Sequence, residues 1–247
     1  MAAKDTMDTD YSDLGGGVIS RMKPAEVLAF KQETRIQESF SAAAERKLLL
    51  WMAKRLPAWV NSDHLTVIGS LGMCLAGTCY VITRWDKRAL LLAIVFLFVN
   101  WFGDSLDGTL ARLRNQQRPR YGFYVDHILD TLGAFCVMGG LAMSGVITPG
   151  IAIGILIAFL MLSIEVYLAT YTLGKFRLSY GKLGPTEIRI ALAIGNLALY
   201  FRGDHVLGGR YLLFDVGGVV GIVGMSAMLI ISAVRHAMQL YREERLS

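Results

Sequence analysis

Charged residues are scarce in this chain. Only 18% of its 247 residues are Asp, Glu, Lys or Arg, whereas 54% are hydrophobic. Soluble globular domains carry about 25% charged residues. The composition therefore excludes a soluble globular protein of this size, and we expect no nucleic-acid partner.

Cysteine is also scarce, and its pattern argues against cysteine-based sites. Cys74, Cys79 and Cys136 all lie in apolar segments, and no C-x-x-C pair or histidine cluster accompanies this odd number. We expect these side chains to be small packing residues rather than zinc ligands or disulfide partners.

The N-terminus lacks an apolar core. Its first twenty residues hold acids, serine and a GGG run, which is not the pattern of a signal peptide. We predict a disordered cytosolic tail over 1–23, an amphipathic interfacial helical region over 24–60, a membrane domain over 61–237 and a polar C-terminal end over 238–247.

Apolar sequence is abundant, and it is gathered into segments of membrane-spanning length, for which roughly 20 residues are needed. Six segments qualify: 64–83, 89–111, 123–145, 148–173, 186–201 and 212–234. The fifth is the weakest, because Glu187 and Arg189 lie at its start. The pattern predicts an all-α polytopic membrane protein with six transmembrane helices.

A region of mixed character precedes these segments. Residues 46–59 interleave Lys and Arg with Leu, Trp and Met, which is typical of an amphipathic helix lying in the headgroup plane. The alternative is a solvated helix that packs on the helical bundle.

Basic residues are unevenly distributed between the two sides of the membrane. Nineteen Lys and Arg residues fall in the N-terminal region, the loops at 112–120 and 175–182, and the C-terminal end, against five in the opposite loops. Basic residues favour the cytoplasmic side. Both termini and the aspartate-rich ends of the second and third spans are therefore expected to face the cytoplasm.

Four aspartates interrupt the apolar sequence of those two spans: Asp104, Asp107, Asp126 and Asp130. A carboxylate within a membrane costs about 3 kcal/mol or more, so such acids usually serve a function. Helix capping could explain one of them but not four. Four converging carboxylates would repel one another unless cations lay between them.

Helical spacing places these acids on two faces. Asp104, Asp107, Gly108 and Ala111 share one face of the second span, with Arg112 two turns beyond Asp104. On the third span, Gly122, Asp126 and Asp130 form a similar stripe. The short loop at 113–121 predicts that the two spans are antiparallel neighbours whose acidic stripes face each other.

Oxygen ligands of this kind suit a hard cation, Mg²⁺ or Mn²⁺. Four carboxylates are enough for two ions, which could neutralise a diphosphate, and a guanidinium such as that of Arg112 can bind a phosphate. The pattern therefore indicates two-metal chemistry on an anionic substrate at a membrane surface.

The two stripes together resemble the signature of the CDP-alcohol phosphotransferase family, DxxDGxxAR followed by GxxxDxxxD. All eight positions match, from Asp104 to Arg112 and from Gly122 to Asp130. The resemblance implies a six-helix membrane enzyme that transfers a substituted phosphoryl group from a CDP-activated alcohol to a second alcohol and releases CMP. At least one of the two substrates would be a lipid.

The resemblance also implies roles for individual residues. Asp104, Asp107, Asp126 and Asp130 would ligate two ions, and Gly108, Ala111, Arg112 and Gly122 would line the cytidine diphosphate pocket. Asp130 would be the base that takes the proton of the attacking hydroxyl, with His127 as the second candidate.

Other residues resemble the choline/ethanolamine phosphotransferase branch, in which an Asp-His pair like Asp126-His127 occurs. Phe123 departs from that branch, where an acid is common. Possible acceptor contacts are Glu165, Lys175, Arg177, Glu187 and Arg189. Glu165 could instead pair with Arg189 or Lys175, and the basic residues could have surface roles.

The identity of the CDP-activated donor stays open between CDP-diacylglycerol and a CDP-aminoalcohol. The Asp-His pair favours the CDP-aminoalcohol. The short chain and small loops favour a bacterial inner membrane, and the resemblance implies a homodimer. Two other functions remain as alternatives, a divalent-cation transporter and a non-catalytic relative. A closely spaced glycine set, Gly217, Gly218, Gly221 and Gly224, predicts close helix packing in the last span.

Overall fold

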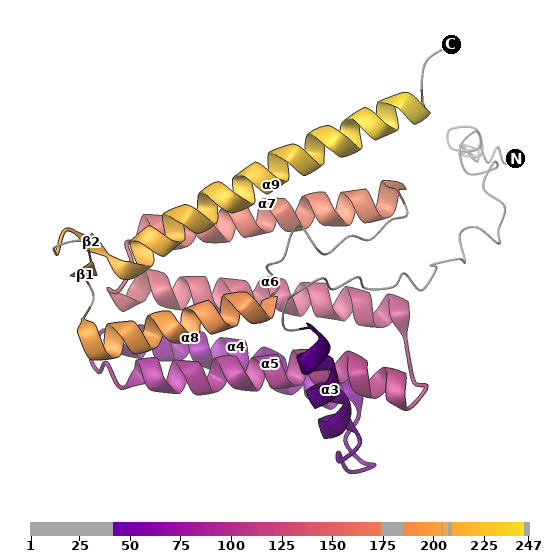
Figure 1. The fold of residues 1–247 in the computed structure, drawn as a ribbon, viewed down its shortest axis with the longest axis horizontal. Coiled ribbons are helices and arrows are strands. Elements are labelled where there is room, and N and C mark those ends of the chain that lie inside the picture. Colours follow the sequence, from indigo (N-terminus) through magenta and orange to yellow (C-terminus); the bar gives the residue numbers. More distant parts are fainter. Residues whose placement is uncertain (1–41, 174–184, 204, 207–208, 245–247) are drawn as a thin grey trace, which may run out of the picture. The chain divides into compact units, whose positions relative to one another are not determined.

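The computed structural model describes residues 42–173, 185–203, 205–206 and 209–244 (Figure 1). The predicted tail at 1–23 and the first part of the interfacial region lie outside these residues. The elements are α3 (Ala42–Ala53), α4 (Ser62–Ile82), α5 (Ala89–Leu113), α6 (Pro119–Ser144), α7 (Pro149–Leu173), α8 (Pro185–Arg202), β1 (His205–Val206), β2 (Tyr211–Leu212) and α9 (Leu213–Glu243).

The predicted class, an all-α polytopic membrane protein, is confirmed. Among the described helices, α4, α5, α6, α7 and α9 are long and apolar enough to cross a membrane. The fifth expected span forms as α8, but it carries Glu187, Arg189 and Arg202 within 18 residues and is not among those five. Its crossing of the membrane stays a prediction.

Two features near the C-terminus differ from the sequence-based prediction. A short antiparallel ribbon pairs His205 with Leu212 and Val206 with Tyr211 just before α9. Helix α9 then continues to Glu243, beyond the predicted end of the last span. No proline or glycine follows residue 234 to end the helix, so part of the expected polar C-terminal end is helical.

Helix α4 packs closely on both α5 and α6 through glycines. A Cβ atom added at Gly103 of α5 would lie 2.5 Å from the backbone nitrogen of Gly69. One added at Gly140 of α6 would lie 2.1 Å from the carbonyl oxygen of Gly77. Small residues at such contacts let helix backbones approach closely within a membrane. Helix α4 therefore sets the positions of both aspartate-bearing helices.

The glycines expected to mediate packing in the last span do not act as a group. Gly218 alone of the four packs closely, since a Cβ there would lie 2.5 Å from Ile151 of α7. At Gly217, Gly221 and Gly224, the added Cβ would have no described atom within 4 Å. Within the described residues these three glycines therefore make no close helix contact, and their association with another helix stays a prediction.

Helices α7 and α9 lie side by side (Figure 1) and are fastened at one end. The backbone N–H and the hydroxyl of Thr148, just before α7, donate to the two carboxylate oxygens of Asp215, both at 2.7 Å. Helix α7 also packs on α6, whereas α8 packs on α5.

Helix α3 packs on α5 and also presents apolar residues outward. Leu49 and Ala53 are buried with Leu106 and Leu110 of α5. Trp51 is half exposed, and the Arg55 guanidinium lies 3.8 Å from its ring centroid. Packing on the bundle, the alternative weighed for this region, is thus observed for the described helix, while its exposed face remains suited to a headgroup layer.

Adjacent glycines of α6 provide a matched test of this architecture. Gly140→Ala should lower the thermal stability of the detergent-purified protein by about 1–3 kcal/mol, because the new methyl group meets the α4 backbone. Gly139→Ala, whose Cβ has no described atom within 4 Å, should be neutral or stabilising by up to about 1 kcal/mol through helix propensity. Equal unfolding midpoints for the two variants would contradict the α4–α6 contact.

Candidate active site

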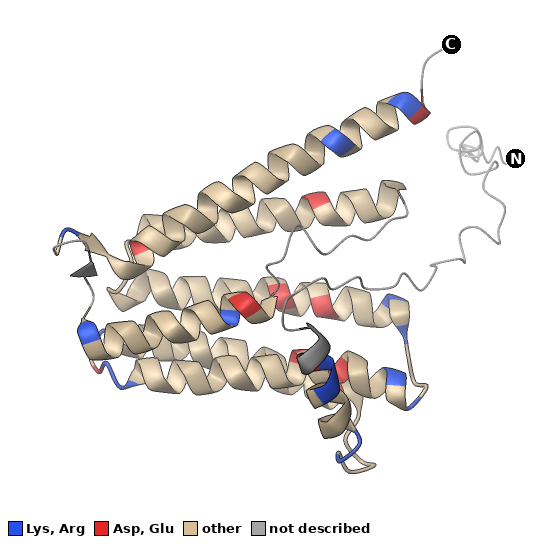
Figure 2. Ribbon diagram, in the orientation of Figure 1, with Lys and Arg blue, Asp and Glu red and all other residues tan. Residues whose placement is uncertain are grey.

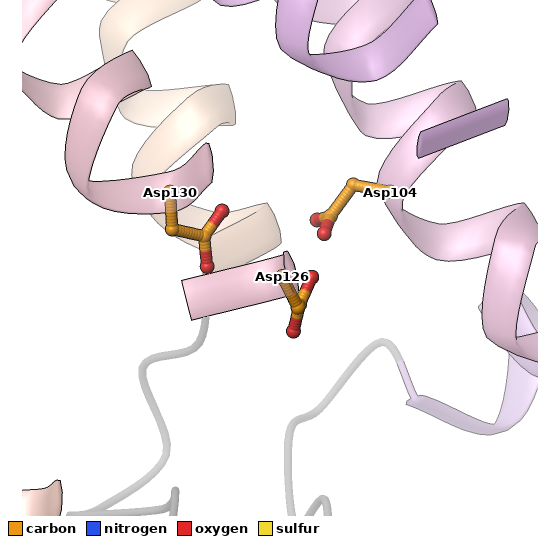
Figure 3. Close-up of side chains that lie close together, drawn as sticks. All are labelled: Asp104, Asp126 and Asp130. Carbon is orange, nitrogen blue, oxygen red and sulfur yellow. The ribbon is translucent and has the colours of Figure 1, made fainter. Parts of the chain in front are cut away.

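Three aspartates from two helices meet in one place. Asp104 of α5 and Asp126 and Asp130 of α6 each offer a carboxylate oxygen, and these oxygens all lie within 4.8 Å of one another (Figure 3). Figure 2 shows the acidic residues of α6 inside the helix, whereas the basic residue of α6 lies at the end where the helix begins. The predicted convergence of the two acidic stripes is therefore present.

The way in which the stripes meet differs from the prediction. Helices α5 and α6 were expected to pack on each other, but among the described elements the extensive contacts of each are with α4. The glycine contacts draw α5 and α6 onto α4, leaving a small cavity between the aspartates. Residues of α4 also line this cavity: Thr66, Gly69, Ser70 and Met73.

Asp107 lines the same cavity, but its carboxylate is directed to α4. The hydroxyl of Thr66 donates to Asp107 Oδ2 at 2.7 Å, and Asp107 Oδ1 accepts from the Gly108 backbone N–H. The hydroxyl of Ser62 donates to the Asp107 carbonyl oxygen at 3.1 Å. These donors explain why Asp107 lies beside the three-aspartate cluster and not within it; its role as a metal ligand stays a prediction.

Asp104 has a cationic partner. Arg189 of α8 donates from Nη2 to Asp104 Oδ2 at 2.7 Å, and its side chain is only 15% exposed. The sequence suggested Arg189 as an acceptor contact or as a partner of Glu165. The structure pairs Arg189 with Asp104, at the edge of the aspartate cluster, and places Glu165 against His236, so the suggested pairing of Arg189 with Glu165 is wrong; the role of Arg189 as an acceptor contact stays a prediction.

His127 lies next to the cluster, within an aromatic group. Its ring centroid is 4.1 Å from that of Phe123 and 4.9 Å from that of Tyr167 on α7. Its Nδ1 lies 2.6 Å from the carbonyl oxygen of Phe123, one turn earlier on α6. This contact suits a proton on Nδ1, which the carbonyl accepts.

The residues predicted to line a nucleotide pocket continue from the cluster toward the helix ends. Arg112 donates from Nη2 to the Thr109 hydroxyl at 3.2 Å, and a Cβ added at Gly108 would lie 3.4 Å from Arg112 Nη1. Ala111 is half buried, and a Cβ added at Gly122 would have no described atom within 4 Å. Little side-chain bulk therefore stands between the aspartates and Arg112.

The remaining acceptor candidates are more dispersed. Glu165 of α7, whose side chain is 9% exposed, lies with Oε1 2.6 Å from Nδ1 of His236 on α9. The sequence showed no role for His236, because its partner is distant along the chain. Glu187 is in the first turn of α8. Lys175 and Arg177 lie outside the described residues.

Three residues near the cluster were not identified as site residues from the sequence: Thr66, Tyr167 and Glu45. Thr66 is in the first turn and a half of α4, at the level of Asp107, so its hydroxyl near a helix start was the available signal. Tyr167 and Glu45 had no such signal, since their contacts depend on how α7 and α3 pack.

The ligand atoms that the cavity offers are suited to a hard divalent cation. All the converging groups are carboxylate oxygens, which Mg²⁺ and Mn²⁺ prefer, and the hydroxyl of Thr66 adds another oxygen at the cavity wall. A three-carboxylate cluster has an unfavourable net charge by itself, so a cation fits it electrostatically.

Comparisons with known proteins agree with this site. A sequence profile of the CDP-alcohol phosphatidyltransferase family matches residues 59–235, which include every residue of the cluster. The chain belongs to this family.

Individual relatives are vertebrate enzymes. The chain is 27% identical to cholinephosphotransferase 1 of Gallus gallus over 212 residues, 76% of this chain and 62% of the relative. It is 26% identical to cholinephosphotransferase 1 of Xenopus laevis over 201 residues, 73% of this chain and 49% of the relative. The match thus spans about half to three fifths of these relatives' length.

The Thr66–Asp107 hydrogen bond can be tested by two substitutions of similar size. Thr66→Val removes the hydroxyl donor and should destabilise the protein by about 1–3 kcal/mol, whereas Thr66→Ser keeps the donor and should cost less. Thermal unfolding of the purified variants would measure this difference. If Thr66→Val, which keeps the methyl group, were as stable as the wild type while Thr66→Ser lost stability, methyl packing and not the hydrogen bond would be the contribution of Thr66.

Proposed function

We propose that this chain is a phospholipid-synthesising enzyme that transfers a substituted phosphoryl group from a CDP-activated alcohol to a second alcohol and releases CMP. The observation that carries the proposal is the convergence of Asp104, Asp126 and Asp130, at signature positions of the family, within one cavity of a membrane protein. One of the two substrates is a lipid, because the cavity belongs to helices that span the bilayer.

The four aspartates hold two divalent cations, Mg²⁺ or Mn²⁺, in this proposal. Bound cations would neutralise the diphosphate of the donor. Asp107 completes the ligand set from its place beside Thr66. Gly108, Ala111 and Gly122 leave room for the cytidine diphosphate, and Arg112 binds one of its phosphates bidentately.

The reaction requires one proton acceptor. The hydroxyl oxygen of the acceptor attacks the phosphorus that carries the donor's alcohol, the bond from this phosphorus to the bridging oxygen of the diphosphate breaks, and CMP leaves with that oxygen. Asp130 takes the hydroxyl proton, because it lies in the cavity and is the more exposed end of the cluster. His127 is the second candidate, although its Nδ1 contacts the Phe123 carbonyl.

For the donor we propose a CDP-aminoalcohol, with diacylglycerol as the acceptor. The Asp126-His127 pair supports this choice, as does similarity to proteins named cholinephosphotransferase. CDP-diacylglycerol with a soluble alcohol is the alternative donor. Glu165, Glu187 and Arg189 are proposed acceptor-side contacts, together with Lys175 and Arg177.

The proposal also includes an orientation and an assembly. Both termini and the cavity face the cytoplasm, on the distribution of basic residues. The small loops between the helices are the support for a bacterial inner membrane, although the relatives named above are vertebrate proteins. Homodimerisation is proposed from the family resemblance.

A divalent-cation transporter remains the alternative from another class. A conduction path would need acids spread through the membrane depth, whereas the described cluster lies at one level of α5 and α6. The guanidinium of Arg189 on Asp104 also disfavours a path for free cations. Both observations support a site for a phosphorylated ligand.

Substitution of the cluster tests the enzymatic proposal. Asp126→Asn and Asp107→Asn should lower CMP release from a CDP-alcohol by about 10²-fold or more, since each removes a charged cation ligand. EDTA should abolish wild-type release, and added Mg²⁺ or Mn²⁺ should restore it. The matched control is Asp86→Asn, in the exposed loop before α5, which should keep wild-type turnover. Wild-type turnover in Asp126→Asn would refute the metal assignment.

The choice of donor needs a separate assay. The purified chain should form radiolabelled lipid from CDP-choline or CDP-ethanolamine and diacylglycerol, resolved by thin-layer chromatography. Product from CDP-diacylglycerol and a soluble alcohol, with none from the CDP-aminoalcohols, would assign the alternative donor.

A further inference from the structure

The ion pair between Arg189 and Asp104 lies inside the proposed cation site. Asp104 Oδ2, which accepts from Arg189 Nη2 at 2.7 Å, belongs to a carboxylate of the three-aspartate cluster. Arg189 is 15% exposed and Asp104 is 26% exposed, so solvent screens this pair only partly. A partly buried charge in this position influences any second charge that enters the cluster.

Glu45 of α3 joins the two helices that carry Arg189 and Asp104, from outside the cluster. The Glu45 Oε1 atom accepts from the Trp101 indole at 2.8 Å and from the Thr186 hydroxyl at 3.1 Å. Trp101 lies one turn before Asp104 on α5, and Thr186 lies one turn before Arg189 on α8. Residues one turn apart share a helix face, so Glu45 holds together the two turns that carry the ion pair.

A divalent cation at the cluster and Arg189 compete for the negative charge of Asp104. A cation held by Asp104, Asp126 and Asp130 would lie within a few ångströms of the guanidinium, and two positive charges at that distance in a partly desolvated site repel strongly. The cation must therefore displace Arg189 from Asp104 or bind with reduced affinity.

A diphosphate changes this balance. Its negative charges can interact with a cation on the aspartates and with a guanidinium beside them at the same time. Cation and nucleotide would then each favour the binding of the other, and by linkage the effect is reciprocal.

We propose that Arg189 is an internal counter-ion which competes with the divalent cation for Asp104 and so makes cation binding depend on the CDP moiety. This inference rests on the proposed function. It makes Arg189 a positioning residue at the cation site, a role distinct from the acceptor contact considered above.

The alternative is a permanent structural ion pair. In that case, loss of the guanidinium would lower the stability of α8 on α5 and would leave cation affinity unchanged or weaker. Competition predicts the opposite sign for cation affinity, so the two roles can be separated by measurement.

The experiment is a titration of the detergent-purified full chain with Mn²⁺, followed by electron paramagnetic resonance of the free ion, with and without saturating CDP. The variants are Arg189→Gln, which removes the charge, and Arg189→Lys, which keeps it. Arg189→Met serves as a second neutral variant if Arg189→Gln does not fold. Arg202→Gln, at the other end of α8, controls for a general loss of positive charge.

Without CDP, Arg189→Gln should bind Mn²⁺ about tenfold more tightly than the wild type. The increase in Mn²⁺ affinity that CDP produces should be smaller in this variant by the same factor. Arg189→Lys and Arg202→Gln should resemble the wild type. Equal or weaker Mn²⁺ affinity in the neutral variants, or an unchanged gain from CDP, would overturn the role of Arg189. Failure of the wild type to bind Mn²⁺ with or without CDP would overturn the proposed function as well.

Discussion

The close backbone contact of α4 with two other helices is the constraint on which the site depends. Gly69 and Gly77 lie on α4 about two turns apart, and each receives a glycine of a neighbouring helix at a distance that a side chain would prevent. Because α5 and α6 are both positioned on α4, the separation of their aspartates is set by a third helix. A bulkier residue on α4 would therefore alter the cavity without touching any carboxylate.

Three carboxylates within the apolar region have a compensating group nearby. Asp107 accepts from a hydroxyl of α4, Asp104 from a guanidinium of α8, and Glu165 lies against His236. Each of these partners belongs to another helix, so the contacts that reduce the cost of burying the acids also hold helices together. Local charge compensation and tertiary structure are linked in this bundle.

Local patterns predicted the helices and the cluster, because Asp104, Asp126 and Asp130 are related by helical spacing and a short loop. The sequence could not show that α5 and α6 both pack on α4, since glycines such as Gly77 and Gly140 are common in apolar segments. Nor could it show that Gly217, Gly221 and Gly224 have no close neighbour within the described residues, since glycines on a packed face and on an open face have the same spacing. Partners such as Arg189 of Asp104 depend on contacts between distant segments, which no local spacing encodes.

The single carboxylate of Glu45 has a mechanical consequence for the protein. Since one oxygen accepts from both Trp101 and Thr186, any movement of α3 away from the bundle would leave two donors without that acceptor at once. The outward-facing Trp51 is on the same short helix. A force that moves α3 would therefore act, through the Glu45 carboxylate alone, on both of the helices that carry the Asp104–Arg189 ion pair, α5 and α8.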